Sequence, residues 1–329
     1  GLGLTAHKTT NVEIKKRACT TLKSILEDSN ERDRNLKVAA INGIGILNIG
    51  NQSDEEKMLL KDATSTLEKF FMQKVGAGKA LIQSHCPPAI GKLLNACDDA
   101  DRRAKFIDDF VATLRGKSKI KRSAIQVPMS CALALGQLAS EEDEKACKAL
   151  AEYYKKGKDQ QTQYFSLIAL AQIGGEANRD ELLDALRKGS KALEKPWAAL
   201  ALGVWCHNRI EDGLGTDALV GTEMRKWLDK LKNPETLSAL AIGLGLAKYE
   251  DAADDLRGLL ETHKNKDELA GYICIGLALM NNQRSVEQIT QIVETSVRRP
   301  DRLRQSAIAL GKLGDSKVAP MLADMMTGD

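Results

Sequence analysis

Trp197-Ala-Ala-Leu-Ala-Leu-Gly-Val-Trp205 is the stretch that decides the fold, because its pattern recurs along the chain. From Trp197 it reads variable, small, variable, aliphatic, small, aliphatic and then a position that is usually glycine. Five other segments follow this order: Ser130–Leu138, Phe165–Ile173, Leu237–Gly245, Ala270–Ala278 and Gln305–Leu313. The six positions equivalent to Gly203, in chain order, are Gly136, Ala171, Gly203, Gly243, Gly276 and Gly311, at spacings of 35, 32, 40, 33 and 35 residues. Self-similarity at a period in the thirties is typical of a helical solenoid.

Small residues also recur two positions before the glycine. They are Ala134, Ala169, Ala201, Ala241, Cys274 and Ala309. Such a column indicates that these apolar helices approach their neighbours closely. Charge-rich amphipathic segments lie between them: Glu142–Lys155, Asp180–Lys188, Gly221–Leu231, Asp251–Thr262 and Val286–Val297. Alternating apolar inner and polar outer helices predict an all-α fold, an α-α superhelix of the HEAT/ARM-like solenoid type with about eight to nine two-helix repeats.

The repeats are less regular near the start of the chain. Residues 1–125 are predicted to form degenerate, longer-spaced repeats, and residues 126–329 regular repeats that continue the same solenoid. Gly1-Leu2-Gly3-Leu4 matches Gly243-Leu244-Gly245-Leu246, as if the chain began inside a repeat. We therefore expect a fragment of a longer protein, whose terminal repeats fray or self-associate because they lack polar caps.

The composition is that of a globular protein of 329 residues, with 43% hydrophobic, 28% charged and only 4% aromatic residues. A net charge of +3 does not by itself indicate a nucleic acid or a membrane as partner. No apolar run is long enough to span a membrane. The seven scattered cysteines contain no CxxC pair, which favours reduced, buried thiols and a cytoplasmic location.

The end of the chain carries a family resemblance. Arg304-Gln-Ser-Ala-Ile-Ala-Leu-Gly-Lys-Leu-Gly-Asp315 resembles the inner helix of short HEAT-like repeats of the phycobilisome-lyase type, and Lys317-Val-Ala-Pro-Met-Leu322 is similar to the outer helix that follows it. The resemblance implies the fold. It leaves the function open, because such repeats occur in scaffolds, in adaptors and in a few enzymes, including subunits of bilin lyases or isomerases.

Catalytic motifs are absent from the sequence. The four histidines lie in different repeats, and there is no HExxH sequence and no His-Glu pair of the iron-binding kind found in HEAT-like hydroxylases. Gly76-Ala-Gly-Lys79 lacks the earlier glycine and the following Ser or Thr of a phosphate-binding loop, and is interpreted as a helix-ending turn. We therefore expect no catalytic residue, no metal site and no cofactor.

A basic patch lies in the long connection before Pro128. Its residues are Arg115, Lys117, Lys119, Lys121 and Arg122. They could contact the phosphates of a nucleic acid or an acidic protein surface. The alternative is a solvated linker, which is the commoner role of a charge run.

A stripe of apolar residues is the candidate binding surface. The positions six before and one after the repeat glycine share a helix face, since they lie seven residues apart. In the central repeats they include Phe165, Trp197, Val204, Leu237, Leu244 and Leu277. This stripe is predicted to line a concave groove that binds a partner helix or peptide, so that the chain acts as a protein-interaction scaffold or adaptor. The alternative is that the stripe is core, or that the segment Gly213–Gly221 covers it.

Overall fold

The computed structural model describes residues 1–75, 77–95, 99–118 and 124–327. These residues form helices joined by short connections, and no strand occurs among them. The chain divides into two compact units, Gly1–Ile173 and Gly174–Asp329. The fold is therefore the all-α solenoid of HEAT type that the repeat pattern predicted. The sequence also predicted less regular repeats in residues 1–125 than in residues 126–329, and this difference stays a prediction.

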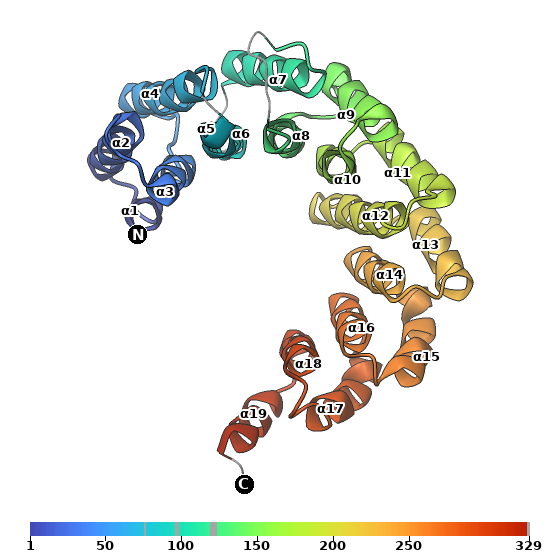
Figure 1. The fold of residues 1–329 in the computed structure, drawn as a ribbon. Coiled ribbons are helices and arrows are strands. Elements are labelled where there is room, and N and C mark those ends of the chain that lie inside the picture. The colour runs from blue at the N-terminus through green and yellow to red at the C-terminus, as the bar shows by residue number, and fades with distance from the viewer. Residues whose placement is uncertain (76, 96–98, 119–123, 328–329) are drawn as a thin grey trace. The chain divides into compact units, whose positions relative to one another are not determined.

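Unit 1 consists of two layers of helices (Figure 1). Its helices are α1 (Leu2–His7), α2 (Val12–Glu27), α3 (Arg34–Gly45), α4 (Asp54–Phe71), α5 (Ala77–Gln83), α6 (Cys86–Asn95), α7 (Ala100–Leu114), α8 (Gln126–Leu138), α9 (Glu144–Lys156) and α10 (Gln160–Ile173). In the inner layer α3 packs on α6, α6 on α8, and α8 on α10. The outer helices α2, α4, α7 and α9 each cover one inner helix. Of the turn expected at Gly76-Ala-Gly-Lys79, Gly76 lies outside the described residues, and Ala77 and Gly78 begin α5 and do not end a helix.

Unit 2 repeats the two-layer arrangement. Its helices are α11 (Glu176–Lys188), α12 (Glu194–Glu211), α13 (Ala218–Lys230), α14 (Pro234–Leu246), α15 (Ala253–His263), α16 (Asp267–Leu279), α17 (Val286–Glu294), α18 (Pro300–Lys312) and α19 (Val318–Thr327), with the 3₁₀ turns η1 (Glu250–Ala252) before α15 and η2 (Gln283–Ser285) before α17. The inner helices α12, α14, α16 and α18 pack on one another in order, and α11, α13, α15 and α17 cover them (Figure 1). The five predicted outer segments coincide with α9, α11, α13, α15 and α17 to within a few residues.

The two layers differ in composition because they differ in surroundings. The inner helix α14 has neighbours on three sides and contains one charged residue, Glu235, in its first turn. The outer helix α13 buries Val220, Met224 and Leu228 along one stripe and presents charged residues to solvent. An apolar stripe is sufficient for an outer helix, whereas an inner helix must be apolar almost all round.

Small residues set the spacing of the inner layer, as the sequence predicted. A Cβ atom added to Gly203 would lie 2.6 Å from the Cα atom of Gly243 in the next inner helix. One added to Gly245 would lie 2.5 Å from the carbonyl oxygen of Gly276. No real Cβ tolerates such distances, so the backbones of successive inner helices are in direct contact at these places.

Ion pairs connect successive outer helices. The Lys23 Nζ atom of α2 lies 2.6 Å from an Asp62 carboxylate oxygen of α4. In unit 2, Arg187 of α11 pairs with Glu223 of α13 at 3.1 Å. These pairs join residues about one repeat apart in sequence, so the polar sides of neighbouring repeats are linked at the surface while their apolar sides pack.

The cysteines that the structure describes carry free thiols, and all but Cys147 are buried. Burial raises the pKa of Cys19 to about 11, and the pKa values of Cys206 and Cys274 to about 12. These side chains act as small apolar residues in the packing. No helix in the described part of the chain is long and apolar enough to cross a membrane.

Candidate functional site

Among the described helices of unit 2, each inner helix packs on its neighbours in the inner layer and on an outer helix, and keeps one partly exposed side. For α14, the neighbours are α12 and α16 in its own layer and α13 in the outer layer. Ser238, Ile242 and Leu246 are partly exposed and share one helix face, since they lie four residues apart. This face is turned away from the outer layer.

The predicted stripe falls into two groups in the structure. Phe165 in unit 1, and Trp197 and Val204 in unit 2, are partly exposed. Leu237 is 2% exposed, and Leu244 and Leu277 are fully buried. The expectation that these three leucines line a groove is therefore wrong, and they belong to the core.

A slip of two residues in the repeat alignment explains this error. Gly203 lies against the following inner helix, whereas Gly243 lies against the preceding one, where an added Cβ would be 2.5 Å from the Ala199 carbonyl oxygen. The residue of α14 that contacts the following helix is Gly245. Two residues correspond to a rotation of about 200° in a helix, so counting from Gly243 places the stripe on the opposite side. Gly276 likewise lies against the preceding helix, 2.4 Å from the Ala241 carbonyl oxygen, and α16 is misaligned in the same way.

Counting from the correct residue gives the inner face of unit 2. In each inner helix, one small residue contacts the following inner helix. The inner face contains the residues three positions before and one position after that small residue. Partly exposed residues one turn earlier belong to it as well. Its apolar members are Trp197, Leu200, Val204, Ile242, Leu246, Tyr272, Ile275, Leu279 and Ile308. Tyr272 is 40% exposed and Ile308 56% exposed, and the sequence analysis missed both. The sequence signal that could have located Tyr272 is the pair of small residues Gly276 and Ala278 in its own helix α16, which matches Gly243 and Gly245 of α14.

The two edges of the inner face carry opposite charges. Helices joined in sequence by tight turns run antiparallel, so α14, α16 and α18 all begin at the same edge. Glu235 and Glu268 are exposed in the first turns of α14 and α16, whereas Asp301 of α18 pairs with Arg304 at 3.0 Å. At the other edge Lys248 and Lys312 are exposed. The inner face of unit 2 is thus an apolar row between an acidic and a basic edge.

The segment Gly213–Gly221 does not cover this face. Residues 212 to 216 are exposed, and the Asp217 carboxylate lies 3.3 Å from the Arg179 guanidinium of the outer helix α11. The segment therefore lies against the outer layer, and the buried leucines owe their burial to packing between the layers.

The predicted basic patch is only partly described. Arg115 directly follows α7, and its guanidinium lies 3.0 Å from a Glu152 carboxylate oxygen of α9. Lys117 is exposed. Lys119, Lys121 and Arg122 lie outside the described residues. In the described part of the patch, Arg115 lies next to an acidic residue. The negative charge of that residue weakens the attraction between Arg115 and a phosphate.

The histidines are not brought together. His7 lies in α1, where its Nδ1 atom is 2.8 Å from the Ile46 carbonyl oxygen. His85 precedes α6, and burial lowers its pKa. Among the described residues no group of three or more His, Cys, Asp or Glu side chains could hold a metal ion.

Comparison with known proteins supports the fold alone. No protein-family model matches the sequence, and no curated protein matches it. Among solved structures, importin beta matches over 100% of this chain and 49% of its own length, with 12% identity and a TM-score of 0.50. Kap121p, in a structure with Pho4p bound, matches over 95% of this chain and 37% of its own, with 12% identity and a TM-score of 0.48. Human deoxyhypusine hydroxylase matches over 92% of this chain and 98% of its own, with 13% identity and a TM-score of 0.35. The chain spans about half the length of importin beta.

Proposed function

We propose that this chain is a non-catalytic protein-interaction scaffold, and that the inner face of unit 2 binds an amphipathic helix or an extended segment of a partner protein. The observation that carries the proposal is the apolar row that crosses four successive inner helices, with Tyr272 and Ile308 among its exposed members. Contiguous apolar surface of this kind usually marks an interaction site.

The charged edges indicate what the partner looks like. A segment that lies along the row has its apolar side on Trp197, Ile242 and Ile275. Basic side chains on one flank would meet Glu235 and Glu268, and acidic side chains on the other would meet Lys248 and Lys312. Such complementarity favours one direction of binding and accelerates association.

Several finer points belong to this proposal. The inner helix α18 coincides with the segment that resembles phycobilisome-lyase-type repeats, which supports assigning the last repeats to that type. A cytoplasmic location fits the free thiols. Self-association through the terminal repeats is an additional expectation. Neither a bilin lyase or isomerase subunit nor a nucleic-acid-binding role is favoured by any feature of the described residues.

The test compares variants of the inner face with a variant of the outer layer. Tyr272→Asp and Ile308→Asp place a charge on exposed inner-face positions, and Leu219→Asp does the same on α13, where Leu219 is 49% exposed. Proteins retained by the wild-type chain and by Leu219→Asp should be lost with both inner-face variants. Hydrogen exchange of the complex should slow in α16 and α18. Equal retention by all variants would show that the inner face is not the binding surface.

Trp197 is the expected anchor of the partner, because large aromatic side chains dominate interface energies. Trp197→Ala should weaken binding of an identified partner by about 2 kcal/mol or more. The helix content measured by circular dichroism should stay unchanged. A variant that loses its helix content would instead assign Trp197 to the core.

A further inference from the structure

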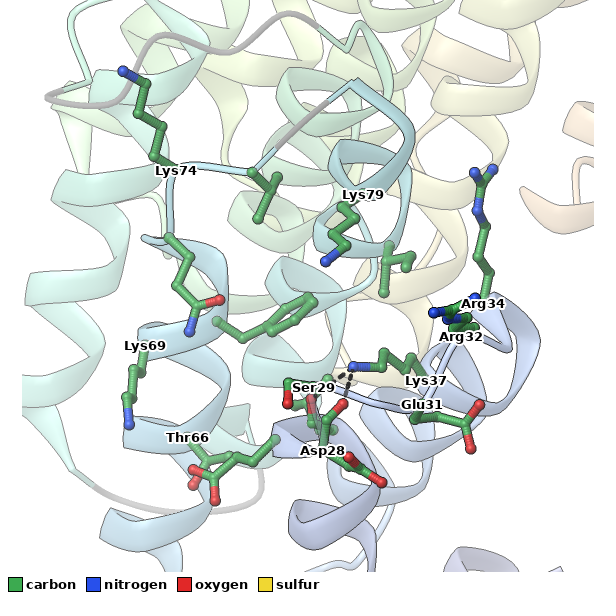
Figure 2. A pocket seen from close by; sticks show the side chains of 16 residues that line it. Asp28, Ser29, Glu31, Arg32, Arg34, Lys37, Thr66, Lys69, Lys74 and Lys79 are labelled. Atoms are coloured by element: carbon green, nitrogen blue, oxygen red, sulfur yellow. Dashed lines mark hydrogen bonds between the residues drawn. The ribbon is translucent and has the colours of Figure 1, made fainter.

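A hollow of about 1060 Å³ lies in unit 1, at one end of its first repeats (Figure 2). It is bounded by the connection from α2 to α3, the end of α4, residues 73–75, and Lys79 and Ile82 of α5. Leu26, Phe70 and Ile82 are buried and contribute an apolar floor. Its size is that of a site for a small organic molecule.

Cationic side chains dominate the wall. They are Arg32, Arg34, Lys37, Lys69, Lys74 and Lys79, against the three carboxylates of Glu27, Asp28 and Glu31. Figure 2 shows Lys79 pointing towards the centre, where the Lys37 ammonium group also lies. Lys69 and Lys74 lie on one side, with their ammonium groups directed away from the centre, and Arg32 and Arg34 lie on the opposite side. We call this site the cationic hollow.

The carboxylates at the rim are already engaged with the backbone. An Asp28 carboxylate oxygen accepts a hydrogen bond from the Asn30 amide at 2.8 Å, and a Glu31 oxygen accepts one from the Asp33 amide at 2.7 Å. None of the six cations forms an ion pair with a described residue. This contrasts with the outer layer, where Lys23 and Lys105 each pair with an acid of the neighbouring helix.

Hydrogen bonds from two side chains satisfy carbonyl groups at the helix ends beside the hollow. Lys37 donates to the carbonyl oxygens of Leu26 and Asp28, at 3.3 and 2.7 Å. The Gln83 side-chain amide donates to the carbonyl oxygens of Phe70, Phe71 and Gln73 at the end of α4. One lysine and one glutamine therefore satisfy these carbonyls. Six cations face three carboxylates along the wall, so the hollow keeps a net positive charge.

We infer that the cationic hollow binds a small molecule that carries several phosphate groups. Lysine and arginine are the side chains that recognise phosphate oxygens through charge-assisted hydrogen bonds. Six cations against three carboxylates in one hollow leave a net positive charge, which suits a compact anion with several charges better than a single carboxylate. The apolar floor would contact the uncharged part of the ligand. This inference is independent of the partner-binding role assigned to unit 2.

The site differs from the phosphate-binding loop that Gly76-Ala-Gly-Lys79 superficially resembles. In such loops backbone amides surround the phosphate. Here the recognition comes from side chains that are separated by up to 47 residues in sequence, from Arg32 to Lys79. Only Lys79 is shared between the two interpretations.

The test is calorimetric titration of the full chain with inorganic tripolyphosphate. The double variant Arg34→Gln/Lys79→Gln should weaken binding by roughly tenfold or more, because two charge-assisted contacts are lost. The matched control is Lys57→Gln. Lys57 is an exposed lysine on α4, 12 residues before Lys69 and therefore about 18 Å away along the helix. The control should change the affinity by no more than about twofold.

Three outcomes would overturn the inference. The first is no binding of tripolyphosphate at low salt. The second is an equal loss in Lys57→Gln and in the double variant, which would show a general effect of net charge. The third is equally tight binding of a glutamate-rich peptide of matched charge, since the site would then recognise acidic peptides and not phosphate. All the substituted residues are exposed, so circular dichroism should confirm that each variant is folded.

Discussion

At the scale of single residues, glycine determines how closely the inner helices approach. Gly203 and Gly311 occupy equivalent places in α12 and α18, yet their surroundings differ. An added Cβ at Gly203 would lie 2.6 Å from the Gly243 Cα atom, whereas one at Gly311 would have no atom within 4 Å. The same substitution should therefore have opposite effects at the two positions.

Gly203→Ala should destabilise the chain by about 1–3 kcal/mol, because the backbones of α12 and α14 must move apart. Gly311→Ala should be neutral or stabilising by up to about 1 kcal/mol, since alanine is the better helix former and nothing opposes its methyl group. Urea denaturation followed by circular dichroism measures both. A Gly203 variant as stable as the wild type would refute the close contact.

At the scale of helices, the ion pair between α11 and α13 links the polar sides of two repeats. Arg187 lies 3.1 Å from Glu223, and Lys226 of α13 lies 3.4 Å from the same carboxylate. The hydrogen bond from Arg187, with the positive charges of Arg187 and Lys226, holds the pKa of Glu223 below its ordinary value of 4.5. A carboxylate with a lowered pKa in the folded state stabilises the protein above its unfolded pKa, and this contribution is lost as the pH falls through the folded value.

Glu223→Gln should therefore lower the stability near neutral pH by less than about 1 kcal/mol, since Arg187 is exposed and solvent screens the pair. The difference between variant and wild type should shrink as the pH falls below 4.5 and should vanish once Glu223 is protonated in the folded state. Thermal melts over this pH range provide the measurement. A constant difference at every pH would mean that the pair contributes nothing through its charge.

The sequence predicted the helices well because each repeat carries its own signal. The apolar pattern of Trp197–Trp205 and the polar pattern of Asp180–Lys188 are local, and α12 and α11 form where they predict. The register between neighbouring helices is not local. In α14, Gly243 and Gly245 both fit the repeat pattern, and only the structure shows which of them contacts the following helix.

The cationic hollow was beyond sequence analysis for a different reason. Arg32, Lys69 and Lys79 lie in separate stretches of the sequence, none of which contains a run of basic residues. Charge runs directed attention to Arg115–Arg122, where Arg115 instead pairs with Glu152. A site built from single side chains of several helices becomes visible only when those helices are placed in space.

At the scale of the whole molecule, a helical repeat array is stabilised mainly by contacts between neighbours. The helices α1 and α19 lie at the two ends of the described chain and have fewer neighbours than the helices between them. Hydrogen exchange should therefore be fastest before Leu26 and after Val318. Uniform protection along the chain would show that the terminal helices are as stable as the central ones.

The buried thiols allow the transient opening of individual repeats to be measured by the rate of chemical labelling. Alkylating reagents attack the thiolate, and Cys19, Cys206 and Cys274 are both inaccessible and hard to ionise, with pKa values of about 11, 12 and 12. Each can react only while its helix is transiently open, so its labelling rate reports how often that repeat opens. In a Cys97→Ser background, the partly exposed Cys147 should react first. Matching rates for Cys206 and Cys274 would mean that α12 and α16 open together, and a different rate for Cys19 would mean that the two units unfold as independent segments.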